Sequence, residues 1–136
     1  MRARDLEPPD LFRAFADATR LRLLNLLLER EICVCDLCEI LGEIQPKVSR
    51  HLAILRRAGL VGVRREGKRK FYALSKEKTP LQQKLFRCVR SCLSEFDVLA
   101  EDRRRLESMQ GRLHCSEGTR PTTRRRAHRR HLKGAI

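Results

Sequence analysis

Three cysteines within six residues form the group in this sequence that is best suited to chemistry. Cys33, Cys35 and Cys38 make a Cys-x-Cys-x-x-Cys pattern. Residues three apart lie on one side of a helix, so the last two thiols can face the same way while the first folds back over that turn. Thiolates are soft ligands that select thiophilic ions. The spacing therefore predicts that three sulfur atoms converge on one soft ion.

The number of ligands narrows the identity of this ion. A structural zinc site takes four ligands in a tetrahedron, whereas this segment supplies three and has no histidine close by. Trivalent arsenic and antimony take three sulfurs in a pyramid, with a lone pair in the fourth direction. The cluster favours these two, and cadmium or lead stays open if a fourth ligand comes from elsewhere. Two other interpretations stay open: small buried packing residues and a dithiol redox switch.

A basic helix and a basic hairpin follow the cysteine segment. Residues 46–58 predict a helix whose core-facing side carries Val48, Leu52 and Leu55, at helical spacing. Groups that contact phosphates and base edges in a major groove lie on the other side or next to it: Gln45, Lys47, Ser49, Arg50, His51, Ala53 and Arg57. The hairpin adds cations at its tip and flanks: Arg64, Arg65, Lys68, Arg69 and Lys70. Helix and hairpin together predict binding to double-stranded DNA.

The elements expected around these residues form a winged helix-turn-helix, mainly α with a small β-hairpin. Gly42 suits the end of a helix, and Glu66-Gly67 between two short strands is a hairpin signal. The expected elements are a helix from residue 8, helix 19–29, edge strand 32–34, helix 36–41, helix 46–58, strands 61–65 and 69–74, and a long helix 80–106. This order is typical of a winged helix-turn-helix.

Two further features concern the last helix and the C-terminal segment. Cys88 and Cys92 fall on an apolar stripe of the last helix and are interpreted as packing residues, with an accessory metal site across a dimer interface as the alternative. Residues 110–136 are basic and nearly without apolar side chains, which is typical of a disordered tail. Cys115 lies there and is expected to be a free thiol. One folded domain is therefore predicted, from residue 8 to residue 109.

The overall composition excludes several classes of protein. A formal net charge of +14 on 136 residues predicts an anionic partner. Aromatic residues make up 4% of the chain, too few for the base-stacking surfaces of RNA-binding proteins. No apolar run could cross a membrane, and the first residues lack the apolar run of a signal peptide. We therefore expect a cytoplasmic location, where six cysteines predict metal-binding or redox-active thiols rather than disulfides.

Several of these segments resemble the ArsR branch of the ArsR/SmtB family of repressors. The resemblance lies in Phe15-Ala-Asp-Ala-Thr-Arg-Leu-Arg-Leu-Leu, in Cys33-Val-Cys-Asp-Leu-Cys, and in Gln45-Pro-Lys-Val-Ser-Arg-His-Leu followed by Leu55-Arg-Arg-Ala-Gly-Leu-Val. It implies a homodimer with the first and last helices at the interface, and repression of an arsenic-resistance operon. It also implies that Cys33 and Cys35 bind the metalloid, with Cys38 as third ligand. Cys88, Cys92 and the basic tail depart from the family pattern.

The sequence thus predicts a repressor rather than an enzyme. It would bind operator DNA as a homodimer and dissociate when As(III) or Sb(III), acting as the inducer, binds the cysteine cluster. The alternative is a DNA-binding repressor that senses redox state, or cadmium or lead. A thiol enzyme is disfavoured because no Cys-x-x-Cys accompanies a βαβ pattern and no histidine lies near the cluster.

Overall fold

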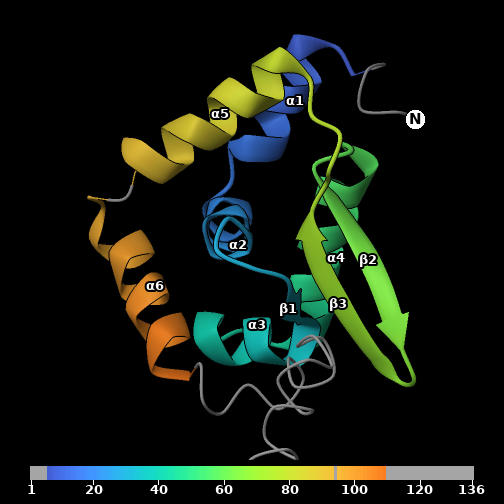
Figure 1. Cartoon of the computed structure of the whole chain (residues 1–136), viewed down its shortest axis with the longest axis vertical. Coiled ribbons are helices and arrows are strands. Elements are labelled where there is room, and N and C mark those ends of the chain that lie inside the picture. The colour runs from blue at the N-terminus through green and yellow to red at the C-terminus, as the bar shows by residue number, and fades with distance from the viewer. Residues whose placement is uncertain (1–5, 94, 110–136) are drawn as a thin grey trace, which may run out of the picture.

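The computed structural model describes residues 6–93 and 95–109 (Figure 1). Its elements in chain order are α1 Pro8–Phe15, α2 Ala18–Leu27, β1 Ile32–Cys33, α3 Val34–Leu41, α4 Gln45–Arg57, β2 Val61–Glu66, β3 Arg69–Leu74, α5 Pro80–Ser91 and α6 Asp97–Met109. As far as β3, this order is the one predicted. The basic tail and Cys115 lie outside the described residues. No helix within the described ranges is long and apolar enough to cross a membrane.

Local sequence signals account for several of the helix ends. Pro8 occupies the first turn of α1, where a missing backbone N–H costs least. Thr79 and Gln82 form a reciprocal capping box at the start of α5. Gly42 ends α3 with φ +67°, a left-handed conformation that a side chain would strain. That glycine lets the chain turn directly into α4.

Asp17 caps the N-terminus of α2. Its side chain accepts a 3.0 Å hydrogen bond from the backbone N–H of Arg20. Burial acts to raise the pKa of Asp17, but this hydrogen bond and the nearby His51 and Arg20 charges outweigh it, so the pKa lies below its ordinary value of 3.8. A depressed pKa means that the stabilisation is complete above the unfolded-state pKa and is lost as pH falls through the folded-state pKa.

We expect Asp17→Ala to lower the free energy of unfolding at neutral pH by about 0.5–2 kcal/mol. Urea unfolding followed by circular dichroism measures this difference, which should shrink as the pH falls below 3.8. Asp10→Ala is the control, because Asp10 forms an exposed ion pair with Arg13 and does not cap α1. A difference that persists unchanged in acid would mean that the carboxylate is not what stabilises α2.

The sheet has three antiparallel strands in the order β1-β3-β2. The hairpin pairs β2 with β3 and turns at Gly67, whose φ is +62°. β1 adds a short edge on the other side of β3, where Ile32 pairs with Tyr72 and Cys33 pairs with Phe71. The predicted hairpin and edge strand are therefore confirmed, and β3 is the central strand between them.

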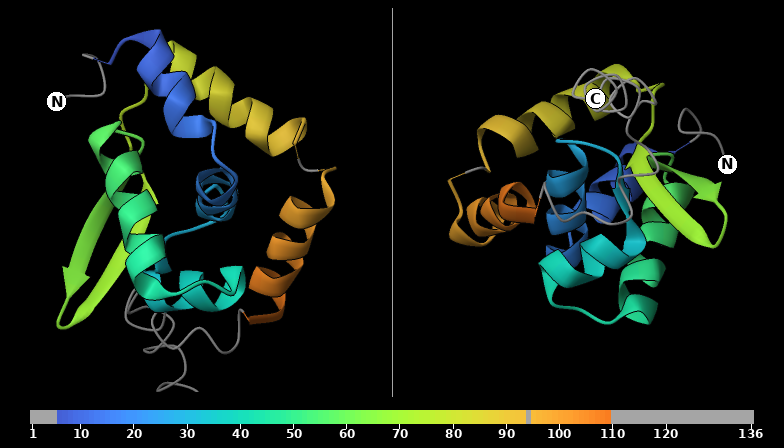
Figure 2. Two further views of the ribbon diagram at one scale, coloured as in Figure 1. Left: turned by 180° about the vertical axis from the view of Figure 1, so that it is seen from behind. Right: turned by 60° about the horizontal axis from the view of Figure 1, so that its bottom comes forward.

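The core is built around α2. Figure 1 and the left view of Figure 2 show this helix end on at the centre, with the other helices arranged around it. Its leucines Leu23, Leu24 and Leu26 are fully buried, as a helix surrounded on most sides requires. Val48, Leu52 and Leu55 of α4 are fully buried as well. The predicted core-facing side of this helix is therefore confirmed.

The prediction of one long helix over residues 80–106 is wrong. The structure has two helices there, α5 and α6, and α5 ends with Cys92 as its C-cap. After the break α6 packs back against α2, where the Asn25 side-chain amide donates a 3.1 Å hydrogen bond to the backbone carbonyl of Leu99. The apolar spacing continues through the break, and no glycine or proline marks it. The break between α5 and α6 is therefore explained by contacts with α2 and not by a local sequence signal.

Candidate metalloid site and nucleic-acid interface

The three cysteines of the cluster lie where β1 passes into α3. Cys33 is both the last residue of β1 and the N-cap of α3, while Cys35 and Cys38 follow in the helix. The Sγ atoms of Cys33 and Cys35 are 3.2 Å apart. Cys33 is buried, Cys35 is exposed, and Cys38 is half-buried, and none of the three forms a disulfide. The structure thus brings two of the three predicted ligands together, one of them open to solvent.

Cys38 is the third thiol of the cluster and lies half-buried on α3. Burial raises the pKa of its thiol, and the nearby Cys33 thiol raises it further, so Cys38 is held in its protonated form at neutral pH. Residues 6–93 and 95–109 contain no group of three or more His, Cys, Asp or Glu side chains arranged to hold a metal ion. The three thiols fit a three-coordinate thiophilic ion by their chemistry, but the structure does not arrange them around a common metal position.

Cys88 and Cys92 lie one turn apart at the end of α5, and both are exposed. The residues of α5 that face the core are Gln82, Phe86 and Val89. The two cysteines therefore do not pack against their own domain, because the buried side of α5 is rotated from the expected stripe. Packing of Cys88 and Cys92 against a partner subunit stays a prediction. Partial desolvation raises the pKa of Cys88, and the neighbouring Cys92 raises it further, which disfavours a thiolate there.

The outward side of α4 and the hairpin lie next to each other along one edge of the molecule (Figures 1 and 2). Gln45, Arg50 and Arg57 are exposed, and Ser49 is partly exposed. Lys47 is held by a 2.7 Å ion pair with Glu43. The structure therefore places most of the predicted DNA-binding residues of α4 on one surface.

His51 differs from these residues because its side chain is turned inward and is 16% exposed. Its Nδ1 lies 3.6 Å from the Asp17 carboxylate and 3.3 Å from the Arg20 guanidinium. These contacts join α4 to the start of α2. His51 therefore has a structural role in this conformation, and its contact with DNA stays a prediction.

The hairpin presents a set of exposed cations beside α4, as expected: Arg65, Lys68, Arg69 and Lys70. Arg64 is different, because protein groups already surround its guanidinium. It forms ion pairs of 2.9 Å with Glu31 and 3.0 Å with Glu66, and it lies 4.7 Å from the centre of the Phe71 ring. The contact with Glu31 could not be predicted, because no local signal pairs two residues 33 positions apart.

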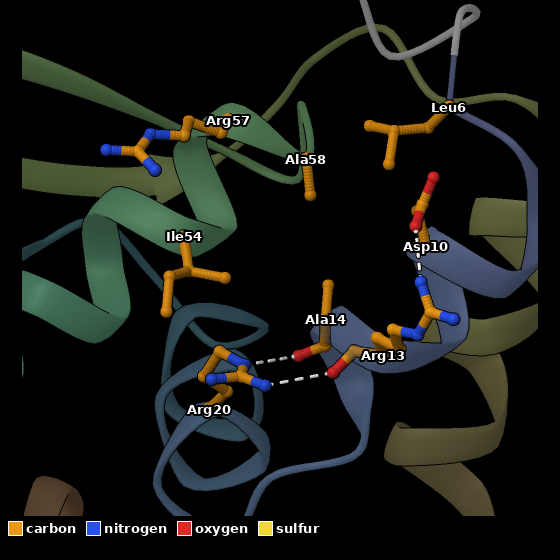
Figure 3. Close-up of a pocket in the computed structure, with 8 residues that line it drawn as sticks. All are labelled: Leu6, Asp10, Arg13, Ala14, Arg20, Ile54, Arg57 and Ala58. Carbon is orange, nitrogen blue, oxygen red and sulfur yellow. Dashed lines mark hydrogen bonds and ion pairs between the residues drawn. The ribbon is translucent and has the colours of Figure 1, made fainter.

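A cleft of about 470 Å³ lies between α1, the start of α2 and the C-terminal end of α4 (Figure 3). Within it, Arg20 donates hydrogen bonds of 2.8 Å to the carbonyl of Ala14 and 2.9 Å to that of Arg13, which ties α1 to α2. Arg57 points away from the other lining residues. The cleft therefore serves the packing of α1, and the contact of Arg57 with DNA stays a prediction.

We expect Arg50→Ala to weaken binding to duplex DNA and to flatten its dependence on salt. If the guanidinium neutralises one phosphate, the slope of log K against log salt should become less negative by about 0.9. Fluorescence anisotropy at several salt concentrations measures both effects. Arg104→Ala is the control, because Arg104 is an exposed arginine of α6 that pairs with Glu101. An equal loss in both variants would assign the effect to net charge rather than to α4.

Comparison with known proteins relates this chain to a family of bacterial regulators. Residues 17–63 match the family profile described as bacterial regulatory protein, arsR family. The chain is 54% identical over 71 residues to the arsenical resistance operon repressor of Escherichia coli (strain K12), covering 52% of this chain and 61% of that protein. It is 37% identical over 108 residues to the arsenic resistance transcriptional regulator ArsR2 of Pseudomonas putida, covering 79% of this chain and 92% of the relative.

Solved structures agree with this assignment. HlyU from Vibrio cholerae matches with a TM-score of 0.54 and 34% identity, over 65% of this chain and 89% of that chain. The homodimeric winged helix-turn-helix DNA-binding domain Mb0332 from Mycobacterium bovis matches with a TM-score of 0.54 and 30% identity, over 64% of this chain and 78% of that chain. The predicted winged helix-turn-helix is thus confirmed. The chain belongs to the ArsR family of bacterial regulatory proteins, and its winged helix-turn-helix makes it a DNA-binding transcriptional regulator.

Proposed function

We propose that this regulator is a repressor that releases its operator when trivalent arsenic or antimony binds Cys33, Cys35 and Cys38. The observation that carries the proposal is the 3.2 Å separation of the Cys33 and Cys35 sulfur atoms, with a third thiol further along the same helix. Three soft thiolates suit a pyramidal thiophilic ion. The Escherichia coli and Pseudomonas putida relatives, whose names refer to arsenic resistance, support the same inducer.

The proposal includes a homodimer formed through the first and last helices. Large apolar side chains are exposed on or beside these helices: Phe12 on α1, Phe96 before α6, and Val98 on α6. Exposed apolar surface of this kind marks interaction sites. The Mycobacterium bovis relative is described as homodimeric. A two-fold dimer would place two copies of α4 in successive major grooves, about 34 Å apart, on a palindromic operator.

Binding of the ion and binding of DNA would oppose each other because α3 leads directly into α4. Only Gly42, Glu43 and Ile44 separate the two helices. Bringing the Cys38 thiol to the Cys33–Cys35 pair must distort the first turns of α3, and the distortion passes to the DNA-binding surface. By linkage, DNA then weakens binding of the metalloid by the same factor.

The same pair of thiols supports a second candidate, a redox-sensing repressor. A peroxide could oxidise the Cys33 and Cys35 thiols to a disulfide, with water as the other product, and this would need no contribution from Cys38. Cadmium is a further alternative inducer, since the chain is 38% identical over 68 residues to a cadmium resistance regulatory protein CadC homologue of Staphylococcus aureus.

One titration separates these candidates. Fluorescence anisotropy of a labelled operator is followed while arsenite, antimonite, cadmium, zinc or hydrogen peroxide is added to separate samples. Arsenite and antimonite should release the operator, and peroxide should not. Release by peroxide alone would replace the proposal with the redox sensor, and release by cadmium alone would replace it with a cadmium sensor.

A further inference from the structure

A row of three residues runs across the sheet from the cysteine cluster to the outer strand of the hairpin. Cys33 on β1 pairs with Phe71 on β3, and Phe71 pairs with Arg64 on β2. Residues directly opposite one another on neighbouring strands have their side chains on the same face. The Phe71 ring is 1% exposed, and the Arg64 guanidinium lies 4.7 Å from its centre. The cysteine and the arginine therefore flank the same aromatic ring.

A direct ion pair joins the two edges of the sheet as well. Glu31 immediately precedes β1, and its carboxylate accepts hydrogen bonds of 2.9 Å from Nη2 and 3.3 Å from Nε of Arg64. The pair bridges β1 and β2, which are not adjacent, since β3 lies between them. The neighbouring carboxylates of Glu31 and then Glu66 raise the pKa of Arg64. Arg64 is thus anchored twice, once to the cysteine segment and once within its own hairpin.

We propose that Glu31 is the residue that couples the cysteine cluster to the wing, which is the hairpin of β2 and β3, through its ion pair with Arg64. This inference rests on the proposed function, in which a metalloid draws the three thiols together. Gathering Cys33 and Cys38 around one ion would shift the junction of β1 and α3, and Glu31 lies two residues before that junction. Because Arg64 is bound to Glu31, the shift displaces the strand of the wing that carries Arg64 and Arg65. The wing then no longer matches the DNA backbone.

Glu66 provides a matched control within the same wing. Its carboxylate binds the same arginine at 3.0 Å, but both residues belong to β2, so this pair does not reach β1. Glu31→Gln and Glu66→Gln change the net charge equally, and each removes one anionic partner of Arg64. Only the first substitution cuts the connection between the cysteine segment and the hairpin.

The experiment measures operator affinity with and without saturating arsenite for the full-length wild type and both variants. Each protein is also checked for its thermal unfolding midpoint and for arsenite binding by the ultraviolet absorption of arsenic–thiolate bonds. In Glu31→Gln, the ratio of the two affinities should fall by about two- to fivefold, the range that a partly exposed ion pair supports. Glu66→Gln should keep the wild-type ratio.

The outcomes distinguish this inference from the proposed function. If the wild type binds no arsenite, or keeps its operator when arsenite binds, the proposed function fails and the coupling fails with it. If the wild type responds and Glu31→Gln responds equally, the coupling role alone is wrong. If both variants lose the same share of the response, the effect belongs to the charge on the wing, and the connection to β1 is again wrong.

Discussion

Cys33→Ser and Cys35→Ser should each abolish the release of operator DNA by arsenite while leaving operator binding in place. Each substitution removes one of three soft ligands and substitutes a hydroxyl, which a thiophilic ion does not select. A typical coupling between two sites is about 1–3 kcal/mol, or about 5- to 150-fold in affinity. The arsenite-dependent ratio of operator affinities should fall from that range to near one. Fluorescence anisotropy with and without arsenite measures the ratio directly.

The two substitutions differ in what they do to the fold. Cys35 is exposed, so its replacement tests the ligand role with little effect on packing. Cys33 is 2% exposed, and a buried hydroxyl without a partner costs about 1–3 kcal/mol, so its thermal midpoint must be measured as well. Cys88→Ser and Cys92→Ser are the matched controls, because both thiols are exposed on α5. Normal release in the first pair and loss in the second would place the sensor on α5.

Asp102→Ala should be the most destabilising single substitution among those considered. The Asp102 carboxylate is buried on α6 and accepts hydrogen bonds of 2.7 Å and 2.9 Å from Nε and Nη2 of Arg22 on α2. The hydrogen bond to Asp102 raises the pKa of Arg22. An arginine stays charged in proteins even without such a partner, so Asp102→Ala leaves the guanidinium charged and unpaired. Breaking a buried ion pair by removing one partner costs about 3–5 kcal/mol. The free energy of unfolding of a native domain is about 5–15 kcal/mol in total, so this loss would be a large share of it.

This pair also determines where α6 lies. Arg22 donates a 3.3 Å hydrogen bond to the carbonyl of Leu41, and Arg105 of α6 donates one of 3.1 Å to the carbonyl of Ile40. Both carbonyls belong to the last turn of α3, which precedes the turn into α4. Loss of the Arg22–Asp102 pair should therefore loosen both α6 and the end of the helix that carries the cysteines.

Urea unfolding measures the free energy lost in Asp102→Ala, and two further variants test whether the buried ion pair is its cause. Glu101→Ala lies on the same helix, but its ion pair with Arg104 is exposed, so its unfolding midpoint should change little. The double variant Arg22→Met with Asp102→Leu should recover much of the stability, because apolar residues of similar volume often replace a buried pair without loss. Equal unfolding midpoints for Asp102→Ala and Glu101→Ala would refute the buried-pair argument.

The sequence by itself determined the features that depend on neighbouring residues. Proline at helix starts, Gly42 between α3 and α4, and Glu66-Gly67 at the hairpin predicted the order of elements as far as β3. Helical spacing identified the buried side of α4, and the spacing of the three cysteines identified the candidate ligands. These signals are local, because caps, turns and periodicity act over a few residues.

The tertiary structure alone decided which distant residues meet. It broke the last helix so that α6 could pack on α2, and it paired Arg22 with Asp102, 80 residues away. It also turned His51 inward, bound Arg64 to Glu31, and brought the Cys33 and Cys35 thiols together. The physical reason is that an ion pair or a shared metalloid depends on the distance between side chains from separate elements. That distance follows from the packing of the whole domain, and residue types and spacing along the chain do not specify it.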